Sequence, residues 1–305
     1  MIRSARLFTL LLAVLIWILT ACGGQPGPAT AVSTDSGVTQ AAPPTAELPA
    51  NDSGVLLVAR VNGQEITLPE FQRALERRQQ MVVDAANPAA LQAEVLDQLV
   101  EQALIEQAAT QQNITVSDEE LQAQIQEHKN LAGSETAWQD WLAANLYTAD
   151  EFSTTLRETL IANLVRDSVI QGLLGNVPQV HARHILVATE AEANDLLAQF
   201  QAGADFAGLA AAHSLDSSTR EAGGDLGWFS QDGLLTPQLA AAAFALQPGQ
   251  IAGPIVTSLG YHIIQTLEIA ERPIEPDMLA YVSQVRFENW LQAQREGAVI
   301  EKYWG

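Results

Sequence analysis

Apolar and polar residues follow two different periods along this chain. Residues 55–67 hold two short apolar runs on either side of Asn62 and Gly63, a dipeptide suited to the positive backbone angles of a tight hairpin turn. Between residues 68 and 175, apolar side chains recur every three or four positions, as they do along amphipathic helices. This first half therefore predicts a short β-hairpin followed by a helical region.

Capping residues show where helices of this region start. Three pairs of residues have the spacing of a capping box, in which a hydroxyl and a carboxylate satisfy free amides of the first turn. The pairs are Thr67 with Glu70, Ser117 with Glu120, and Thr148 with Glu151. Such helices normally bury their apolar stripes against one another, which is the interpretation that the pattern favours. The alternative is an apolar groove that cradles unfolded peptide.

Aromatic residues suggest how the helical region packs. Trp138 and Trp141, three positions apart, share one face of a predicted helix. Residues 277–302 are amphipathic and predict a last helix, which is followed by Tyr303 and Trp304. Aromatic residues at a terminus usually dock on the folded body, so we expect these two to return to the N-terminal helices.

The second half of the chain has the pattern of a mixed sheet. Three apolar runs, Val180–Val187, Ile251–Val256 and Tyr261–Leu267, alternate with short helical segments. A sheet flanked by helices is the natural architecture for such a segment. Together with the helical first half, this pattern predicts an α+β chain.

The first residues have the layout of a signal peptide. Arg3 and Arg6 precede an apolar run from Leu7 to Thr20, and small residues flank Cys22. The ending Leu-Thr-Ala-Cys resembles a bacterial lipobox, in which the cysteine becomes the lipidated first residue of the mature chain. The layout therefore predicts a leader over residues 1–21 and a lipid anchor at Cys22. The alternative is an uncleaved signal anchor, because the run is only slightly short for a membrane span.

Composition adds a tether and limits the chemistry. Residues 22–54 are mostly Pro, Gly, Ala, Ser and Thr, which predicts a flexible tether. The formal charge is -21, and it becomes -23 without the two arginines of the leader. Binding to nucleic acid or to anionic lipid through a basic patch is therefore not expected. Cys22 is the one cysteine of the sequence, which excludes an intramolecular disulfide and a cysteine-based metal site.

Histidines of the second half are candidates for chemistry. His181 and His184 lie on one predicted strand, where their odd offset sends them to opposite faces and gives poor metal-ligand geometry. We therefore expect no metal and no cofactor. A histidine inside an apolar strand is as often a buried core residue as a catalyst. His184 and His262 lie on two strands that could meet across a sheet, which favours a site.

Serines near Asp216 raise the possibility of a hydrolase. Ser214, Ser217 and Ser218 are candidate nucleophiles for such an enzyme, in which a histidine would act as the base. No nucleophile-elbow motif surrounds them, so this interpretation is weak. Asp216 itself is, on pattern alone, a loop or cap residue.

An ordered set of motifs over residues 181–268 resembles the parvulin peptidyl-prolyl isomerases. In chain order they are His-Ile-Leu-Val, Ala-Asp-Phe, His-Ser-x-Asp, Gly-Gly-Asp-Leu-Gly-Trp-Phe, Pro-Gly-Gln-Ile and Gly-Tyr-His-Ile-Ile. One motif alone would mean little, but the ordered set is specific. The resemblance implies a four-stranded antiparallel sheet wrapped by helices, with two histidines side by side at the floor of the site. It also implies cis/trans isomerisation of X-Pro bonds.

Matched motif by motif, the resemblance implies roles for seven residues. The catalytic network falls on His184, Asp216 and His262, with Thr257 near it, and the proline-binding pocket falls on Leu226, Leu235 and Leu239. Leu239 departs from the family, in which an aromatic ring is usual at this place. Family members selective for phosphorylated substrates carry a basic loop, whereas residues 188–192 are Ala-Thr-Glu-Ala-Glu here. Recognition of anionic substrates is therefore not expected.

The flanking segments, with Val61-Asn62-Gly63 before the capped helices and Phe287 to Tyr303 returning at the end, look like the chaperone module of the SurA and PrsA foldases. This likeness implies a helical domain over residues 55–178, completed by a C-terminal helix within 273–305, with the parvulin domain at 179–272 inserted between them. The protein expected is a foldase for unfolded, proline-containing exported polypeptides. It would be exported and lipid-anchored at the outer face of the cell membrane, or at a periplasmic or outer-membrane leaflet. No oligomeric state is predicted.

Two alternatives to the foldase stay open. One is a holdase chaperone whose parvulin domain is inactive, which the Leu239 departure would permit. The other is a lipoprotein that simply binds a partner or a small ligand.

Overall fold

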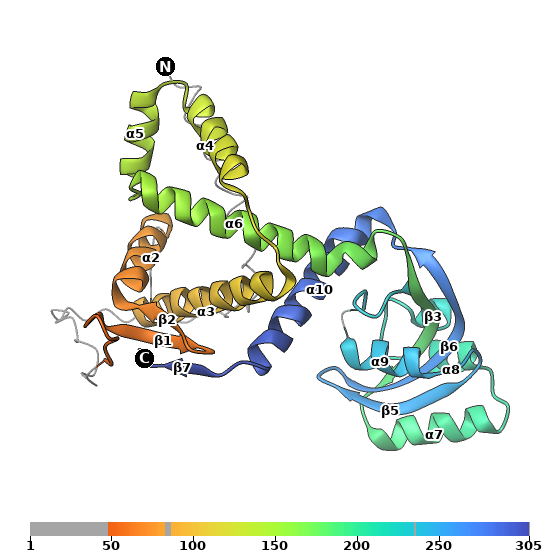
Figure 1. Cartoon of the computed structure of the whole chain (residues 1–305). Helices are drawn as coiled ribbons and strands as arrows, with labels where there is room; N and C mark the ends of the chain where they lie inside the picture. The colour runs from red at the N-terminus through yellow and green to blue at the C-terminus, as the bar shows by residue number, and fades with distance from the viewer. Residues whose placement is uncertain (1–47, 83–86, 235, 305) are drawn as a thin grey trace, which may run out of the picture. The chain divides into compact units, whose positions relative to one another are not determined.

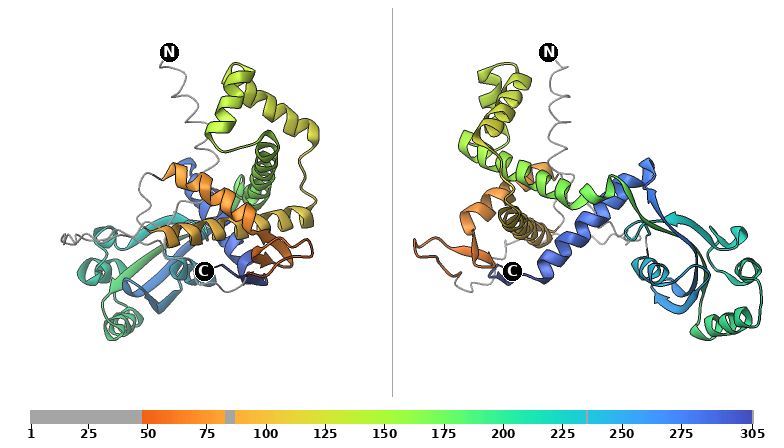
Figure 2. Two further views of the ribbon diagram at one scale, coloured as in Figure 1. Left: turned by 90° about the vertical axis from the view of Figure 1, so that its left-hand side faces the viewer. Right: turned by 45° about the vertical axis from the view of Figure 1, so that its right-hand side comes forward.

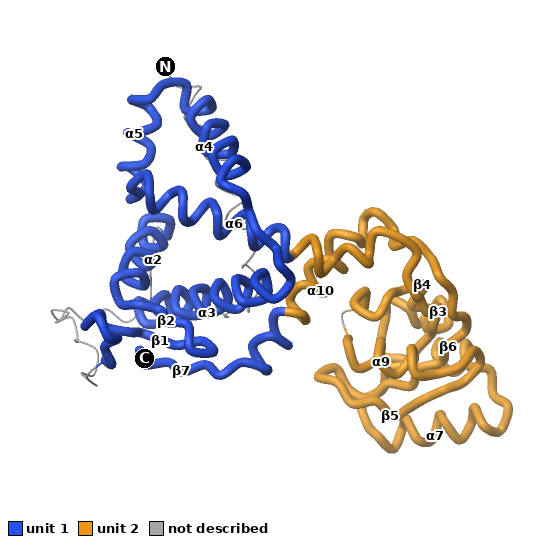
Figure 3. Tube along the Cα trace, viewed as in Figure 1, with its two compact units in different colours: residues 1–165, 291–305 blue, residues 166–290 orange. Residues whose placement is uncertain are grey.

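The structure is a computed structural model, and it describes residues 48–82, 87–234 and 236–304. The chain forms two compact units, one made of residues 1–165 and 291–305 and the other of residues 166–290 (Figure 3). The second unit is therefore an insertion between two segments of the first. Cys22 and Leu235, two residues singled out in the sequence, lie outside the described residues.

A small sheet brings the two ends of the first unit together. Strands β1 (Leu57–Val61) and β2 (Gln64–Thr67) form the predicted hairpin, with Asn62 and Gly63 at φ values of 51° and 86° in its turn. Strand β7 (Ile300–Lys302) pairs with the free edge of β1, so that the three strands lie side by side in the order β2-β1-β7 (Figures 1 and 2).

The last helix is shorter than the sequence pattern predicts. Helix α10 (Pro276–Glu296) was expected to continue to Lys302, but it ends before Gly297, a weak helix former. The residues beyond it complete the backbone hydrogen bonds of β1, a tertiary gain that the local pattern does not contain. The chain end does dock as expected, because the ring of Trp304 lies 5.2 Å from that of Phe71 in the first N-terminal helix.

Five helices make up most of the described part of the first unit. They are α2 (Leu68–Met81), α3 (Pro88–Gln112), α4 (Asp118–Ala132), α5 (Glu135–Ala144) and α6 (Ala149–Ile170), whose last turn belongs to the second unit. All three predicted capping boxes are present: Thr67, Ser117 and Thr148 each accept a bond from the amide of the glutamate three residues on. The predicted helix starts are thereby confirmed.

An aromatic cluster joins α4, α5 and α6. Trp138 is 2% exposed and stacks on Trp141, with 5.4 Å between the ring centres, and Phe152 meets both rings edge-on. Arg157 of α6 donates to the Val116 carbonyl over 2.6 Å, which ties α6 to the segment before α4. The apolar faces of these helices therefore pack against one another, as the pattern favours.

Residues 48–54 belong to the folded first unit and not to a free tether. The carbonyl of Pro49 accepts a bond from the amide of Leu57, and the Asn51 side chain accepts from Val55 and donates to Glu65. Sequence composition predicted a flexible segment here, but a few polar contacts suffice to fix it. Within the described residues, no helix has the length and apolar character needed to cross a membrane.

The second unit is built on a four-stranded antiparallel sheet with the order β4-β3-β6-β5. Its strands are β3 (Asn176–Val187), β4 (Asp225–Phe229), β5 (Ile251–Thr257) and β6 (Gly260–Pro273). Three helices, α7 (Glu190–Gln201), α8 (Phe206–His213) and α9 (Pro237–Ala245), and the 3-10 turn η2 (Arg220–Ala222) connect them. A further 3-10 turn, η1 (Gln171–Leu173), precedes β3. This arrangement confirms the expected α+β chain with an inserted parvulin-like domain.

The two faces of this sheet carry separate cores. Ile185 and Ile263 pack with α7 and α8, whereas Ala182 and Ile264 pack with α9. Because side chains alternate along a strand, His184 and His262 point to the α9 face. The two predicted histidines therefore start on the same side of the sheet.

Gly224 lies directly against the backbone of β3. Its φ is +83°, and a Cβ placed there would sit 2.1 Å from the carbonyl oxygen of His184. The amide of His184 also donates to the Gly224 carbonyl over 2.8 Å. Only glycine fits this approach, since any side chain would push the loop away from the strand.

We expect Gly224→Ala to lower the free energy of unfolding by more than about 4 kcal/mol, because backbone atoms on both sides cannot move aside. Gly227→Ala is the matched control: its φ is +69°, but no atom lies within 4 Å of its Cβ position. It should cost only about 1–2 kcal/mol of left-handed backbone strain. Urea unfolding of both variants measures the difference. Equal losses would show that the contact with His184 is not the constraint.

Candidate active site

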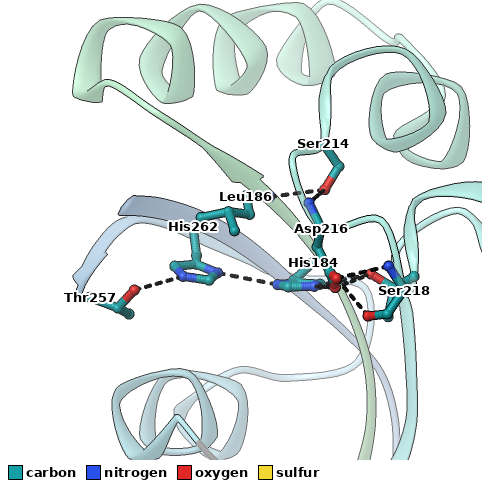
Figure 4. A network of polar contacts seen from close by, with 8 residues as sticks. His184, Leu186, Ser214, Asp216, Ser218, Thr257 and His262 are labelled. Atoms are coloured by element: carbon teal, nitrogen blue, oxygen red, sulfur yellow. Dashed lines mark hydrogen bonds and ion pairs between the residues drawn. The ribbon is translucent and has the colours of Figure 1, made fainter. Parts of the chain in front are cut away.

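Two imidazoles meet on the α9 face of the sheet. His184 of β3 and His262 of β6 are 5% and 1% exposed, and their Nδ1 atoms lie 3.2 Å apart (Figure 4). Strand register explains the contact, because His262 pairs with Leu186, two residues beyond His184 on the same face. The structure thus brings together the two histidines that the sequence singled out.

A carboxylate reaches this pair from the loop after α8. Asp216 Oδ2 lies 2.7 Å from His184 Nε2. The buried Ser214 hydroxyl holds the loop, since it accepts bonds from the amides of Leu186 and Asp216 (Figure 4). The Leu215 amide also donates to the Leu186 carbonyl. Asp216 is therefore placed by the backbone of β3 itself.

Two hydroxyls that the sequence analysis did not assign to the site complete the surroundings of Asp216. Ser218 Oγ and Thr219 Oγ1 each donate to its carboxylate over 2.5 Å, and Thr219 Oγ1 lies 3.1 Å from His184 Nε2. Burial by itself would raise the pKa of Asp216, but the bonds from Ser218, Thr219 and His184 outweigh burial and hold it well below its ordinary range. In the sequence, the run of hydroxyl residues directly after Asp216 was the signal from which these contacts could have been predicted.

Thr257 closes the other end of the network. Its Oγ1 lies 2.9 Å from His262 Nε2. Because ionised Asp216 can only accept, His184 donates to it through Nε2, and in the tautomer with a single ring proton its Nδ1 accepts. His262 must then donate through Nδ1 and accept the Thr257 hydroxyl proton at Nε2. All donors in this histidine chain, Thr257–His262–His184–Asp216, therefore point toward the carboxylate.

The surroundings keep His262 uncharged. Burial is the largest cause, and together with the neighbouring His184 it lowers the pKa of His262 to about 4, against a smaller opposing effect of Asp216. A base of this strength is poorly matched to remove a proton from the Thr257 hydroxyl near neutral pH. The geometry is thus suited to a fixed, polarised site and not to the activation of a nucleophile.

Apolar side chains border the histidine chain. Leu226 is partly exposed and packs on the α9 core, whereas Leu239 belongs to that core and is 2% exposed. Ile255, which the sequence analysis did not select, pairs directly with His262 and is partly exposed on the same face. The β5 strand pattern marked it as apolar, but only the register with β6 places it beside the histidine.

The other candidate chemistries find no support in the geometry. His181 faces away from the histidine chain and contacts Asp225 instead, with 2.8 Å from Nε2 to Oδ1. Ser214 and Ser218 are engaged with the Leu186 amide and the Asp216 carboxylate, and not with a histidine. Across residues 48–82, 87–234 and 236–304, His, Asp and Glu side chains form no group of three that could hold a metal ion.

Family models match both parts of the chain. A SurA-like N-terminal domain matches residues 31–166, and a PPIC-type PPIase domain matches residues 177–268. The fold and the site thus define a parvulin-type peptidyl-prolyl isomerase joined to a SurA-like module.

Curated relatives and solved structures similar to this chain include PrsA foldases and a SurA chaperone. The chain is 32% identical over 240 residues to the foldase protein PrsA of Caldanaerobacter subterraneus subsp. tengcongensis. The aligned residues cover 72% of this chain and 76% of that protein. It is 35% identical over 144 residues to the chaperone SurA of Alkalilimnicola ehrlichii, covering 41% and 33%. A crystal structure of PrsA from Bacillus anthracis is similar to this chain with a TM-score of 0.41 and 26% sequence identity. The match covers 66% of this chain and 96% of that one. The 32% identity to the Caldanaerobacter PrsA over 72% of this chain shows that the chain belongs to the PrsA family of parvulin-type peptidyl-prolyl isomerases.

The low pKa of His262 can be measured directly. Long-range ¹H–¹⁵N spectra of the chain's five histidines, assigned with His262→Asn, should show His262 titrating near pH 4 and carrying its proton on Nδ1 above that pH. Because an unfolded histidine titrates near 6.5, the unfolded state binds more protons between these values, so the His262 contribution to stability is lost as pH falls from about 6.5 to 4. His262→Asn should flatten this part of the stability profile. Titration of His262 near 6.5 would contradict the burial argument.

Proposed function

We propose that this protein isomerises X-Pro bonds of exported polypeptides at the apolar surface beside the histidine chain, without a covalent intermediate. The observation that supports this most is the continuous run of hydrogen bonds from the Thr257 hydroxyl to the Asp216 carboxylate. It fixes every donor in the site before a substrate arrives. In this proposal His184, His262, Asp216 and Thr257 form the polar network, and Leu226 and Leu239, together with Leu235, hold the proline ring.

The chemistry of the reaction fits a site of this kind. Rotation about a peptide bond is opposed by amide resonance, with a barrier of about 18–20 kcal/mol, and no bond has to be cleaved to overcome it. An apolar surface can hold the proline ring while fixed dipoles favour the twisted amide over the planar one. Burial of the two histidines keeps these dipoles away from water, where they would be weaker.

The remainder of the chain suggests where and on what the isomerase acts. We propose a leader over residues 1–21, a lipid anchor at Cys22 and a tether reaching to the first folded residues, which places the protein on the outer side of a membrane. The helical SurA-like domain, 55–178 with the C-terminal helix of 273–305, would hold unfolded client next to the parvulin domain at 179–272. The strongly negative charge favours clients with positive charge.

A holdase with an inactive parvulin domain is the second candidate. The observation that favours this candidate is Leu239, which replaces the family's usual aromatic ring and is only 2% exposed. An aliphatic side chain so deeply covered offers little surface to a proline ring. Such a protein would suppress aggregation of unfolded chains without changing the rate of proline isomerisation.

Proline-limited refolding separates the two candidates. The chain without residues 1–21 should accelerate refolding at substoichiometric concentration, and Asp216→Asn should slow that turnover by roughly tenfold or more. The reason is geometric: the Ser218 amide fixes the asparagine oxygen, so its NH₂ group faces His184 Nε2 and reverses the donors of the histidine chain.

The matched control for this experiment is Ser217→Ala. Ser217 is exposed and adjacent to Asp216, and its replacement should leave the turnover near that of the unaltered chain. Suppressed aggregation with no acceleration by the unaltered chain would establish the holdase. Equal turnover of Asp216→Asn and the unaltered chain would remove Asp216 from the site.

The lipid anchor has its own test. Cys22→Ala removes the thiol that would carry the lipid, so the precursor should keep its leader or leave the membrane fraction in fractionated cells. Mass spectrometry of the unaltered protein should show a lipid on the N-terminal cysteine. Unchanged processing and unchanged membrane attachment of Cys22→Ala would contradict the anchor.

A further inference from the structure

One hollow in the inserted unit is lined by no member of the histidine chain. It holds about 250 Å³ and lies among the beginning of β3, the end of β4, the end of β6 and the start of α10. Its lining includes Trp228, Ser230, Arg272, Glu275, Met278 and Val282. We call it the Ser230 hollow.

Ser230 lines the hollow with a hydroxyl that lacks a partner. The residue is 5% exposed, and its Oγ makes no hydrogen bond to any residue that the structure describes. Gly233 follows in a tight turn, with its amide donating to the Ser230 carbonyl over 2.9 Å, and a Cβ at Gly233 would sit 3.0 Å from the hydroxyl. The hydroxyl is buried beside Gly233, at a place where any side chain would crowd it. A buried hydroxyl without a partner is destabilising, which points to a ligand as its partner.

Arg272 adds further donors to the wall of the hollow. Its guanidinium lies over the ring of Trp228, 4.6 Å from the ring centre. No carboxylate of the described residues lies within ion-pair distance of it, whereas the hollow also contains Glu275. One positive and one negative side chain leave the walls without net charge. A neutral group that accepts hydrogen bonds therefore fits better than an ion.

The rest of the hollow is apolar and small. Met278 is 39% exposed at its edge, and Val282 is 1% exposed at its base. Pockets for small-molecule ligands typically measure about 300–1,000 Å³, so this one suits a single amino-acid side chain with its peptide group. Trp228 provides a rigid aromatic wall for such a side chain.

We propose that the Ser230 hollow binds one large apolar residue of an extended, uncharged polypeptide, whose backbone carbonyl accepts bonds from Ser230 and Arg272. The inference rests on the proposed function, because an unfolded polypeptide is the ligand that a foldase holds. It gives the inserted unit a second anchoring point on the client, separate from the proline-binding surface.

The test uses N-acetyl-phenylalanine amide as the probe and the chain without residues 1–21 as the protein. Titration should shift the indole N–H signal of Trp228 in ¹H–¹⁵N spectra, assigned with Trp228→Phe. Ser230→Ala should weaken binding by roughly two- to tenfold while the melting temperature stays equal or rises, since no intramolecular bond is lost. A hydroxyl with a purely structural role would give the opposite result, a lower melting temperature with unchanged binding.

Control variants and probes make the result specific. Ser258→Ala removes an exposed hydroxyl of the same unit outside the hollow and should leave the affinity unchanged. N-acetyl-alanine amide should bind more weakly than the phenylalanine probe, because it lacks the large side chain. Tighter binding of N-acetyl-phenylalanine with a free carboxylate would overturn the proposal in favour of an anion site. No shift of the Trp228 signal with any probe would overturn it entirely.

The same preparation distinguishes failure of the hollow from failure of the proposed function. His262→Asn alters the histidine chain but none of the residues of the hollow, so the probe should still shift Trp228 when refolding turnover is reduced. Probe binding without acceleration of refolding by the unaltered chain would refute the isomerase and keep the hollow. Acceleration of refolding without probe binding would refute the hollow as a binding site and keep the isomerase.

Discussion

The hydrogen bond between the His184 imidazole and the Asp216 carboxylate organises the inserted unit around one residue. Through its side chain, His184 contacts the loop after α8 and strand β6, and through its backbone it contacts Gly224. Three segments far apart in sequence therefore converge on a single position of β3. Ionised Asp216 sets the direction of every donor in the histidine chain, so the polarity of the site follows from one carboxylate held below its usual pKa.

The strands that carry the histidines also explain how one unit can be inserted into another. Strands β3 and β6 remain paired from Val187 with Tyr261 to Asn176 with Pro273, so the segments that enter and leave the insertion lie next to each other. A small apolar cluster of Leu173, Val177 and Val282 packs at this base. Adjacent ends let a domain be inserted without disturbing the fold of its host. Within the first unit, β7 pairs with β1, so the segment that follows the insertion in sequence shares a sheet with the segment that precedes it.

Local patterns and motif order predict much of this structure, and their limits are physical. The capping boxes set the helix starts because they depend on neighbours in sequence. Alternation assigns His184 and His262 to a face of their own strands, but the register of β3 with β6 brings the two together. Strand β4 contains Gly227 and has no apolar alternation, so only the family resemblance implied a fourth strand. Strand β7 exists because β1 has a free edge, a condition that no local window contains.

The site itself shows the same division between local and tertiary information. Motif order identified Asp216, but its bonds to Ser218 and Thr219 depend on the turn that follows it. Ile255 joins the site through the register of β5 with β6. Leu239 matched the proline pocket by position, yet its side chain is almost completely covered by the α9 core, which only the packed structure reveals.

Charged side chains on and directly after β3 lie on the face of the sheet opposite to the histidine pair. The arginine nearest in sequence to the histidine pair, Arg183, points to the opposite face of the sheet, where it lies 4.7 Å from the ring centre of Phe206 and donates to Gln265 over 2.8 Å. Glu190 and Glu192 follow β3 in the first turn of α7, and α7 packs on that same opposite face. On the face of the histidine pair, Leu226 and Ile255 belong to the apolar cluster around α9, and Ile255 pairs directly with His262. The contacts that this face offers beside the pair are therefore apolar.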